Sequence, residues 1–232
     1  MNEDARQQPL QETEPPPPSA ILPRPCLMLV TEPMEPTRLT AIIRVAVAGG
    51  VDIVQIRDKT AQAGDLLKIV AVLRRSLPKT LLVLNSIPSS AQGGFGSGIH
   101  LPERGGGLSR IRKTLSTEAL VGRSIHWVSA AQRAESEGAD YLVAGTIFPS
   151  ASHPDIAPAG LDFLEQVCRA VALPVLAIGG VTPERVGDCL RAGAAGVAVL
   201  SPIMRAADPF RAALQYRLAL DREWQAAAGE VS

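Results

Sequence analysis

Eight short apolar runs recur along the chain between residues 27 and 200, and their regular recurrence limits the fold more than any other feature. Each run has four to six residues, and most are apolar at consecutive positions, which is typical of strands in a parallel sheet that is covered on both faces. The runs lie at residues 27–30, 53–56, 81–84, 98–101, 120–125, 141–144, 174–178 and 196–200.

Segments with helical periodicity lie between most of these runs. The expected helices are at residues 40–48, 64–77, 129–138, 160–171, 182–192 and 208–226. The fifth has a favourable start, because Thr182 offers a capping hydroxyl and Pro183 suits the first helical position. Eight strands alternating with helices in a chain of 232 residues predict an α/β fold, a single (β/α)8 TIM barrel, in preference to an open doubly wound sheet.

Two segments depart from this alternation. Residues 1–24 include the run Pro15 to Pro18 and few apolar residues, so we expect a disordered proline-rich leader, either solvated or used for docking. The barrel domain is then expected at residues 25–232. Residues 86–98 are rich in glycine and form helices poorly, which predicts an irregular connection there.

The charge balance and the cysteines narrow the range of partners. The 23 basic and 23 acidic side chains cancel, so nucleic acid is not an expected partner. No signal peptide and no apolar run of about 18 residues is present, which predicts a cytoplasmic protein without a membrane partner. Cys26, Cys168 and Cys189 are widely spaced and are interpreted as small hydrophobic residues. Small barrels often pair, so a homodimer is compatible with the sequence.

Polar residues at the ends of the predicted strands are the candidates for substrate binding, since these positions line the active site of a barrel. The candidates are Gln55, Arg57, Lys59, Asn85, His100, Ser124, Ser150 and Ser152. Ser150 and Ser152 belong to a long loop at residues 145–153 that could close over a ligand. His100 either contacts the ligand or fills the upper layer of the barrel interior.

His126 directly follows the fifth predicted strand, where an imidazole would face the mouth of the barrel. An imidazole suits proton transfer at neutral pH because its ordinary pKa is about 6.5. We therefore predict His126 as the catalytic residue, the alternative being a histidine packed against Trp127. No histidines have metal-ligand spacing and no carboxylate pair stands at the strand ends, so no metal is expected.

Two turns near the C-terminus predict a phosphate site. Gly179 and Gly180 precede the helix start at Thr182, and Leu200 and Ser201 end the eighth predicted strand. Backbone N–H groups beside helix N-termini bind phosphate, and barrels often place such a site after strands seven and eight. The alternative is that these glycines serve tight turns only.

These same residues resemble a known superfamily, that of thiamine-phosphate synthase and the thiazole tautomerase of thiamine biosynthesis. The likeness runs from about Leu27 to about Tyr216. Its landmarks are Asn85 and residues 29–31, 54–59, 122–126, 145–153, 178–183 and 196–201. The resemblance implies a TIM barrel that binds a phosphorylated thiazole.

The resemblance leaves the branch to be decided by departures from the synthase pattern. Synthases need Mg²⁺ to neutralise the departing pyrophosphate, and they carry Asp after the strand-three Asn, a second Asp after strand four and a lysine in the long loop. Here Ser86 follows Asn85, residues 100–105 carry no Asp, and His153 takes the place of the lysine. Leu101 and Pro102 resemble the tautomerase branch, which favours a thiazole tautomerase-like isomerase without a cofactor.

The expected isomerase aromatises a carboxylated thiazole phosphate by an intramolecular proton shift, with His126 as the shuttle. Arg57 would pair with the substrate carboxylate, and Ser150 or Ser152 would hold the carboxylate or the ring. Gln55, Arg57 and Lys59 nevertheless resemble the pyrimidine-diphosphate contacts of a synthase. Two alternatives therefore stay open: a thiamine-phosphate synthase that uses Mg²⁺, and a non-catalytic regulatory paralogue.

Overall fold

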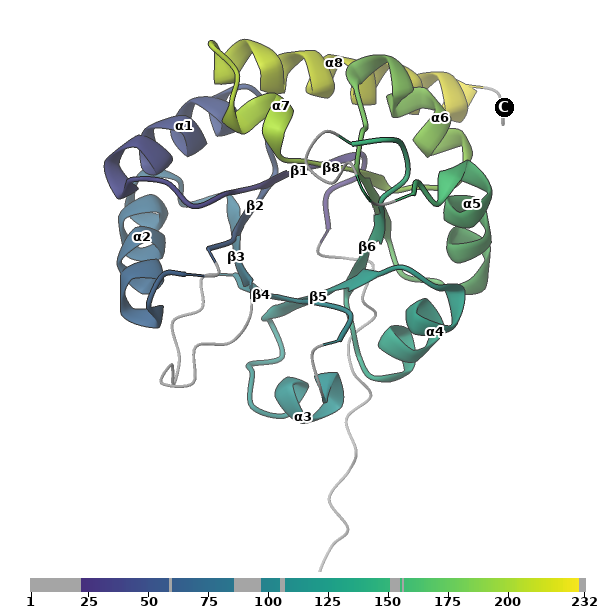
Figure 1. Ribbon diagram of the computed structural model, residues 1–232, viewed down its shortest axis with the longest axis horizontal. Coiled ribbons are helices and arrows are strands. Elements are labelled where there is room, and N and C mark those ends of the chain that lie inside the picture. The colour runs from purple at the N-terminus through teal and green to yellow at the C-terminus, as the bar shows by residue number, and fades with distance from the viewer. Residues whose placement is uncertain are drawn as a thin grey trace, which may run out of the picture.

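Eight parallel strands close into a barrel in which each strand pairs with the next and β8 pairs with β1. The computed structural model describes residues 22–58, 60–85, 97–104, 107–150, 155 and 157–229. Figure 1 looks along the barrel, with the helices arranged around it and α8 lying across α1 and α6. The predicted (β/α)8 fold is confirmed.

The strands match the predicted apolar runs to within one residue at each end. They are β1 (Cys26–Val30), β2 (Ile53–Ile56), β3 (Leu81–Asn85), β4 (Gly98–Leu101), β5 (Leu120–Ile125), β6 (Tyr141–Gly145), β7 (Val175–Ile178) and β8 (Gly196–Val199). Because side chains alternate along a strand, Met28 packs in the barrel interior, while Leu27 and Leu29 pack in the layer under the helices. This two-sided burial is why the runs are continuously apolar.

Six helices correspond to the predicted ones. They are α1 (Pro36–Ala48), α2 (Ala63–Ser76), α4 (Val128–Ser136), α5 (Gly160–Ala170), α6 (Val186–Arg191) and α8 (Pro209–Gly229). α1 begins four residues earlier than predicted, because the Glu35 carboxylate accepts the N–H groups of Thr37 and Arg38 at 2.8 Å and caps the helix.

The region after β7 differs from its prediction. A 3₁₀ turn, η2 (Pro183–Arg185), precedes α6, and the Thr182 side chain makes no capping hydrogen bond. The expected hydroxyl cap is therefore wrong, although Pro183 does open the turn. Two further helices, α3 (Leu108–Arg112) and α7 (Ser201–Met204), were not predicted, because they are too short to show helical periodicity.

The N-terminal leader and the glycine-rich connection are described only in part. Residues 1–21 and 86–96 lie outside the described residues. Leu22 is buried with Cys26 and Met28 in the interior cluster, so the packed domain reaches beyond the predicted boundary at residue 25.

The amino ends of the strands are held by two equivalent aspartates. Asp52 accepts the Leu27 N–H at 2.8 Å and pairs with Arg217 at 3.1 Å. Asp140 accepts the Val121 N–H at 2.7 Å and pairs with Arg112 at 3.1 Å. Burial raises the pKa of both carboxyls. These contacts tie strand starts to helices, as is usual for the stability face of a barrel.

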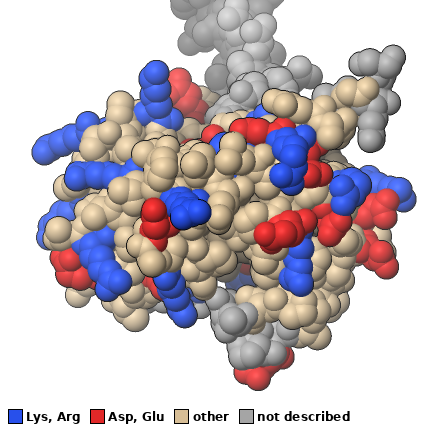
Figure 2. Space-filling model, turned by 90° about the horizontal axis from the view of Figure 1, so that it is seen from above, with Lys and Arg blue, Asp and Glu red and all other residues tan. Residues whose placement is uncertain are grey.

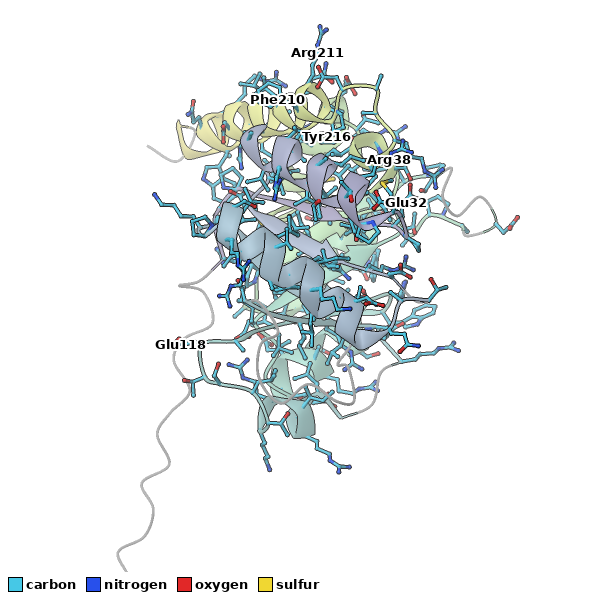
Figure 3. The ribbon with its side chains drawn as sticks, turned by 90° about the vertical axis from the view of Figure 1, so that its left-hand side faces the viewer. Glu32, Arg38, Glu118, Phe210, Arg211 and Tyr216 are labelled. Atoms are coloured by element: carbon cyan, nitrogen blue, oxygen red, sulfur yellow. The ribbon has the colours of Figure 1, made fainter. Side chains whose placement is uncertain are left out.

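The opposite end of the barrel carries the candidate site. Figure 3 shows Glu118, just before β5, and Glu32, just after β1, at opposite ends of the molecule. On the face shown in Figure 2, basic and acidic side chains are interspersed.

Candidate functional site

A cavity of about 750 Å³ opens at the carboxyl ends of the strands. Residues that end or follow all eight strands line it, from Val30 at the end of β1 to Ser201 after β8. Its volume lies within the range of sites for small molecules.

The cavity brings together most of the residues predicted from the sequence. The predicted residues that line it are Gln55, Arg57, Asn85, Ser124, His126, Ser150, Gly179, Gly180, Leu200 and Ser201. Lys59 and Ser152 lie outside the described residues, so their predicted contacts have no structural counterpart. For the ten residues that line the cavity, the structure gives the position, and their roles remain predictions.

His100 lies in the barrel interior instead of the cavity lining, with 1% of its surface exposed. Its Nδ1 is 3.1 Å from the Tyr141 hydroxyl and its Nε2 is 2.9 Å from Ser124 Oγ. Burial, followed by the nearby charge of Arg123, lowers the pKa of His100 to about 3. The imidazole is therefore neutral and supports Ser124 from below, which matches the barrel-filling alternative and not direct ligand contact.

Two glycines at the end of β7 form one side of the predicted phosphate site. Gly179 and Gly180 have φ values of +96° and +62°, which are accessible mainly to glycine. A Cβ on Gly180 would lie 2.3 Å from the Pro149 carbonyl oxygen. Within the described part of the chain, the Gly180 N–H has no hydrogen-bond acceptor. Gly180 lines the cavity, so its N–H is a candidate donor to an anion there.

Side chains from η2 and α8 hold this turn in place. Arg185 donates to the Gly180 carbonyl at 2.9 Å, and its guanidinium lies 4.7 Å from the centre of the Phe148 ring. Tyr216 on α8, labelled in Figure 3, donates to the Val181 carbonyl at 2.9 Å. Burial is the main cause that raises the pKa of Tyr216 to about 12, so the phenol keeps its proton as a donor.

The other side of the predicted phosphate site lies at the end of β8. Leu200 and Ser201 line the cavity at the start of α7. Arg205 lines it one turn later and forms a two-point ion pair with Glu32, with contacts of 2.9 and 2.7 Å. The hydrogen bonds from Arg205 lower the pKa of the Glu32 carboxyl.

The charged side chains that line the cavity favour an anionic ligand. Among the described residues they are Arg57, Arg185, Arg205 and Glu103, three positive charges against one negative. Part of the Arg205 charge is balanced by Glu32, which is outside the lining. We call Gly179, Gly180, Leu200 and Ser201 the anion cradle.

A second polar group faces the cavity from β2 and β3. Gln55 donates from Nε2 to Asn85 Oδ1 at 2.8 Å, which joins the two strand ends. The Arg57 N–H donates to Thr31 Oγ1 at 2.9 Å, which joins β2 to the end of β1. We call Gln55, Arg57 and Asn85 the amide–arginine cluster. It lies across β1 from the anion cradle in the strand order.

His126 and Glu103 form a pair that the sequence analysis did not identify. The His126 Nδ1 lies 2.8 Å from Glu103 Oε2, and the His126 N–H donates to Oε1 at 3.1 Å. Glu103 follows β4 by two residues, so its place near a strand end could have been predicted from the sequence. Arg185 and Arg205 were also missed: Arg185 lies in η2, inside the segment predicted as a helix, and Arg205 follows α7, which was not predicted.

The donor set of the cavity does not fit a divalent cation held by carboxylates. No group of three or more His, Cys, Asp or Glu residues suited to a metal occurs in the described ranges. Residues 86–96 contain no Asp or Glu.

Residues 27–203 match the family model described as thiamine monophosphate synthase. The chain belongs to the thiamine monophosphate synthase family. The match covers every strand except the first residue of β1. Membership places this protein in thiamine biosynthesis, as the resemblance implied.

Relatives of this thiamine monophosphate synthase family member carry the synthase name. The thiamine-phosphate synthase of Natronomonas pharaonis is 40% identical over 174 residues, 72% of this chain and 81% of the relative. That of Methanoculleus marisnigri is 36% identical over 181 residues, 77% of this chain and 86% of the relative. The thiamine phosphate pyrophosphorylase structure from Pyrococcus furiosus has a TM-score of 0.76 at 26% identity, and the match covers 86% of this chain and 98% of that one.

These comparisons support the family and the synthase alternative, and they do not support the tautomerase branch that the departures from the synthase pattern favoured. None of the helices formed by the described residues has the length and apolar character needed to cross a membrane.

Proposed function

We propose that this protein is a thiamine-phosphate synthase, an enzyme that joins a pyrimidine diphosphate to a thiazole phosphate. The names of its relatives support this activity. The observation that carries it in the structure is one cavity of about 750 Å³ with two polar ends, the anion cradle and the amide–arginine cluster. A joining reaction needs two anionic substrates in one chamber, and this cavity offers a separate anchor for each.

In this proposal each end binds one phosphate-bearing substrate. The Gly180 N–H and the turn at Ser201 bind the thiazole phosphate, with Arg185 and Arg205 nearby as positive charges. Arg57, Gln55 and Asn85 bind the diphosphate of the pyrimidine. Holding both substrates in the right orientation turns a bimolecular reaction into an effectively unimolecular one.

In the joining reaction, the negative charge that develops in the transition state lies mostly on the departing diphosphate. The thiazole nitrogen forms a bond to the methylene carbon of the pyrimidine, and the bond from that carbon to the diphosphate oxygen breaks. Negative charge then builds up on the departing pyrophosphate. The Arg57 guanidinium can pair with two phosphate oxygens at once and stabilises that charge.

Product formation from purified protein tests the proposal. Hydroxymethylpyrimidine diphosphate and thiazole phosphate are incubated with the enzyme over a range of Mg²⁺ concentrations and with a chelator, and thiamine phosphate and pyrophosphate are measured. We expect equal amounts of both products, a strong loss in Arg57→Ala and no loss in Arg74→Ala, a matched control on the exposed surface of α2. Absence of product at every Mg²⁺ concentration would refute the synthase activity.

The pairing of His126 with Glu103 favours a second candidate, the thiazole tautomerase. In that reaction one proton leaves the thiazole ring and one arrives at the exocyclic carbon, and His126 Nε2 could carry both in turn. The observation that supports it, besides the pair, is a donor set that does not fit a carboxylate-held cation.

Deuterium incorporation distinguishes this candidate. The carboxylated thiazole phosphate isomer is incubated with the protein in D₂O, and aromatic product is followed by absorbance and NMR. Tautomerase activity predicts aromatic product that His126→Gln abolishes. Ligand binding without turnover in either assay would identify a non-catalytic paralogue.

A further inference from the structure

The His126 side chain is held at two points by one carboxylate. Glu103 Oε2 lies 2.8 Å from the ring Nδ1, and Oε1 accepts the main-chain N–H of the same residue at 3.1 Å. Contacts from a ring atom and a main-chain atom of one residue fix the side chain relative to its backbone. No contact to the ring Nε2 is found among the described residues.

The main chain of Glu103 is held by the neighbouring strand. Arg123 on β5 donates from Nη2 to the main-chain carbonyl of Glu103. The Glu103 side chain is 19% exposed and the His126 side chain is 53% exposed. The pair therefore stands at the wall of the cavity, with the acid on the protein side and the imidazole on the open side.

A carboxylate beside one ring nitrogen decides which nitrogen carries the proton. An ionised carboxylate only accepts hydrogen bonds, so Nδ1 must carry the hydrogen that it receives. A neutral imidazole has one N–H, so Nε2 is then left as an acceptor. The same arrangement of acid and imidazole fixes the tautomer in serine hydrolases.

We infer that Glu103 is a positioning residue that fixes His126 in the Nδ1–H tautomer and presents Nε2 to the ligand as a hydrogen-bond and proton acceptor. The inference rests on the proposed function only in that the ligand occupies the cavity that His126 lines.

A contribution to stability does not account for the pair. Ion pairs between exposed groups contribute little to folding, typically less than about 1 kcal/mol. A role as a metal ligand does not account for it either, because Glu103 belongs to no group of three or more His, Cys, Asp or Glu suited to a metal among the described residues. What the two contacts do fix is the orientation and the proton position of one imidazole.

Nitrogen NMR of protein labelled with ¹⁵N at histidine tests the inference without any assay of activity. The chain has three histidines, so the His126→Gln variant identifies the His126 signals. At a pH where the imidazole is neutral, we expect the wild-type ring to show a protonated Nδ1 and an unprotonated Nε2. Glu103→Ala removes both contacts and should give signals averaged over the two tautomers.

Two variants complete the test. Glu103→Gln keeps the size of the side chain but replaces one acceptor oxygen with an NH₂ donor, so it should also change the His126 signals. If Glu103→Ala does not fold, Glu103→Gln alone tests whether Glu103 fixes the His126 tautomer. Glu118→Gln, an exposed glutamate at the opposite end of the barrel, should leave them unchanged. A wild-type His126 protonated at Nε2, or signals that are the same in wild type and both Glu103 variants, would overturn the inference.

Kinetics provides a second readout. In whichever of the two reactions His126→Gln slows, Glu103→Gln should lower kcat about tenfold or more with little change in KM. A change in KM alone would contradict a positioning role. If neither reaction proceeds, the proposed function fails, and the NMR result still decides the tautomer.

Discussion

The buried His100 should make the protein lose stability as the pH falls through a range where most proteins are unaffected. In the folded state its pKa is lowered to about 3, mainly by burial. An unfolded chain binds a proton at this residue near pH 6.5. The stabilising effect of keeping His100 neutral is therefore complete above about pH 6.5 and is lost progressively as the pH falls towards 3.

The size of the effect follows from these two values. Between pH 7.5 and pH 5, a shift from 6.5 to about 3 lowers the free energy of unfolding by ~2 kcal/mol. Replacing His100 with glutamine removes the titrating group. The variant is expected to be less stable throughout, because it alters the contacts to Tyr141 and Ser124. The prediction concerns only the pH dependence.

Urea unfolding at several pH values between 5 and 7.5 measures this dependence. Wild type should lose ~2 kcal/mol more than His100→Gln over this range, since all carboxyl groups are common to both proteins. Val72→Ala is the matched control, because Val72 is exposed on α2 and carries no titrating group, and it should keep the wild-type slope. The same slope in wild type and His100→Gln would refute the neutral, buried histidine.

Three further predictions concern the anion cradle, its support from α8 and the aspartate anchor at the opposite end of the barrel. Gly180→Ala puts a Cβ against the Pro149 carbonyl oxygen; it should weaken inorganic phosphate binding at least about tenfold and lower the free energy of unfolding by about 1–3 kcal/mol. Gly64→Ala, with open space around it, should not affect binding. Equal phosphate affinities of the two variants in calorimetry would contradict this. Tyr216→Phe leaves the Val181 carbonyl without its donor and should lower the free energy of unfolding by about 1–3 kcal/mol; an unchanged urea midpoint would count against it. Asp140→Ala removes the partner of Val121 and Arg112 and should lower the free energy of unfolding by about 3 kcal/mol. The exposed Glu118→Ala should leave that free energy almost unchanged, and equal losses in the two variants would argue against the aspartate anchor.

The strands could be predicted closely because their burial is visible in the sequence. A strand such as β2, covered on both faces, must be apolar at consecutive positions, and turn residues mark its ends. The short helices α3 and α7 could not be predicted, since a single turn of helix has no periodicity. The early start of α1 depends on the Glu35 cap, a contact between side chain and backbone that the apolar pattern does not show.

The site could be predicted in position but not in its pairings. A strand end points Gln55, Asn85 and Ser124 towards the mouth of the barrel, and the cavity contains them. Whether a histidine reaches the ligand or stays in the interior depends on its place along the strand: His100 lies inside β4, whereas His126 directly follows β5. Glu103 shows the same limit, because its partner lies on the next strand and only the folded barrel brings the two together.

The branch of the superfamily was harder to infer because the two kinds of evidence differ. Individual residues such as Ser86 depart from the synthase pattern, while similarity over most of the chain links it to proteins named thiamine-phosphate synthase. The departing residues indicate how a cation would be bound, whereas similarity over most of the chain indicates a common fold and family.

Calorimetric titration of the two anionic ligands tests the central claim most directly, namely that one cavity anchors two phosphate-bearing substrates at separate ends. Thiazole phosphate should bind one to one, and pyrophosphate should still bind one to one to the saturated complex. Gly180→Ala should weaken only the first ligand and Arg57→Ala only the second. Competition between the two ligands for a single site would contradict the account.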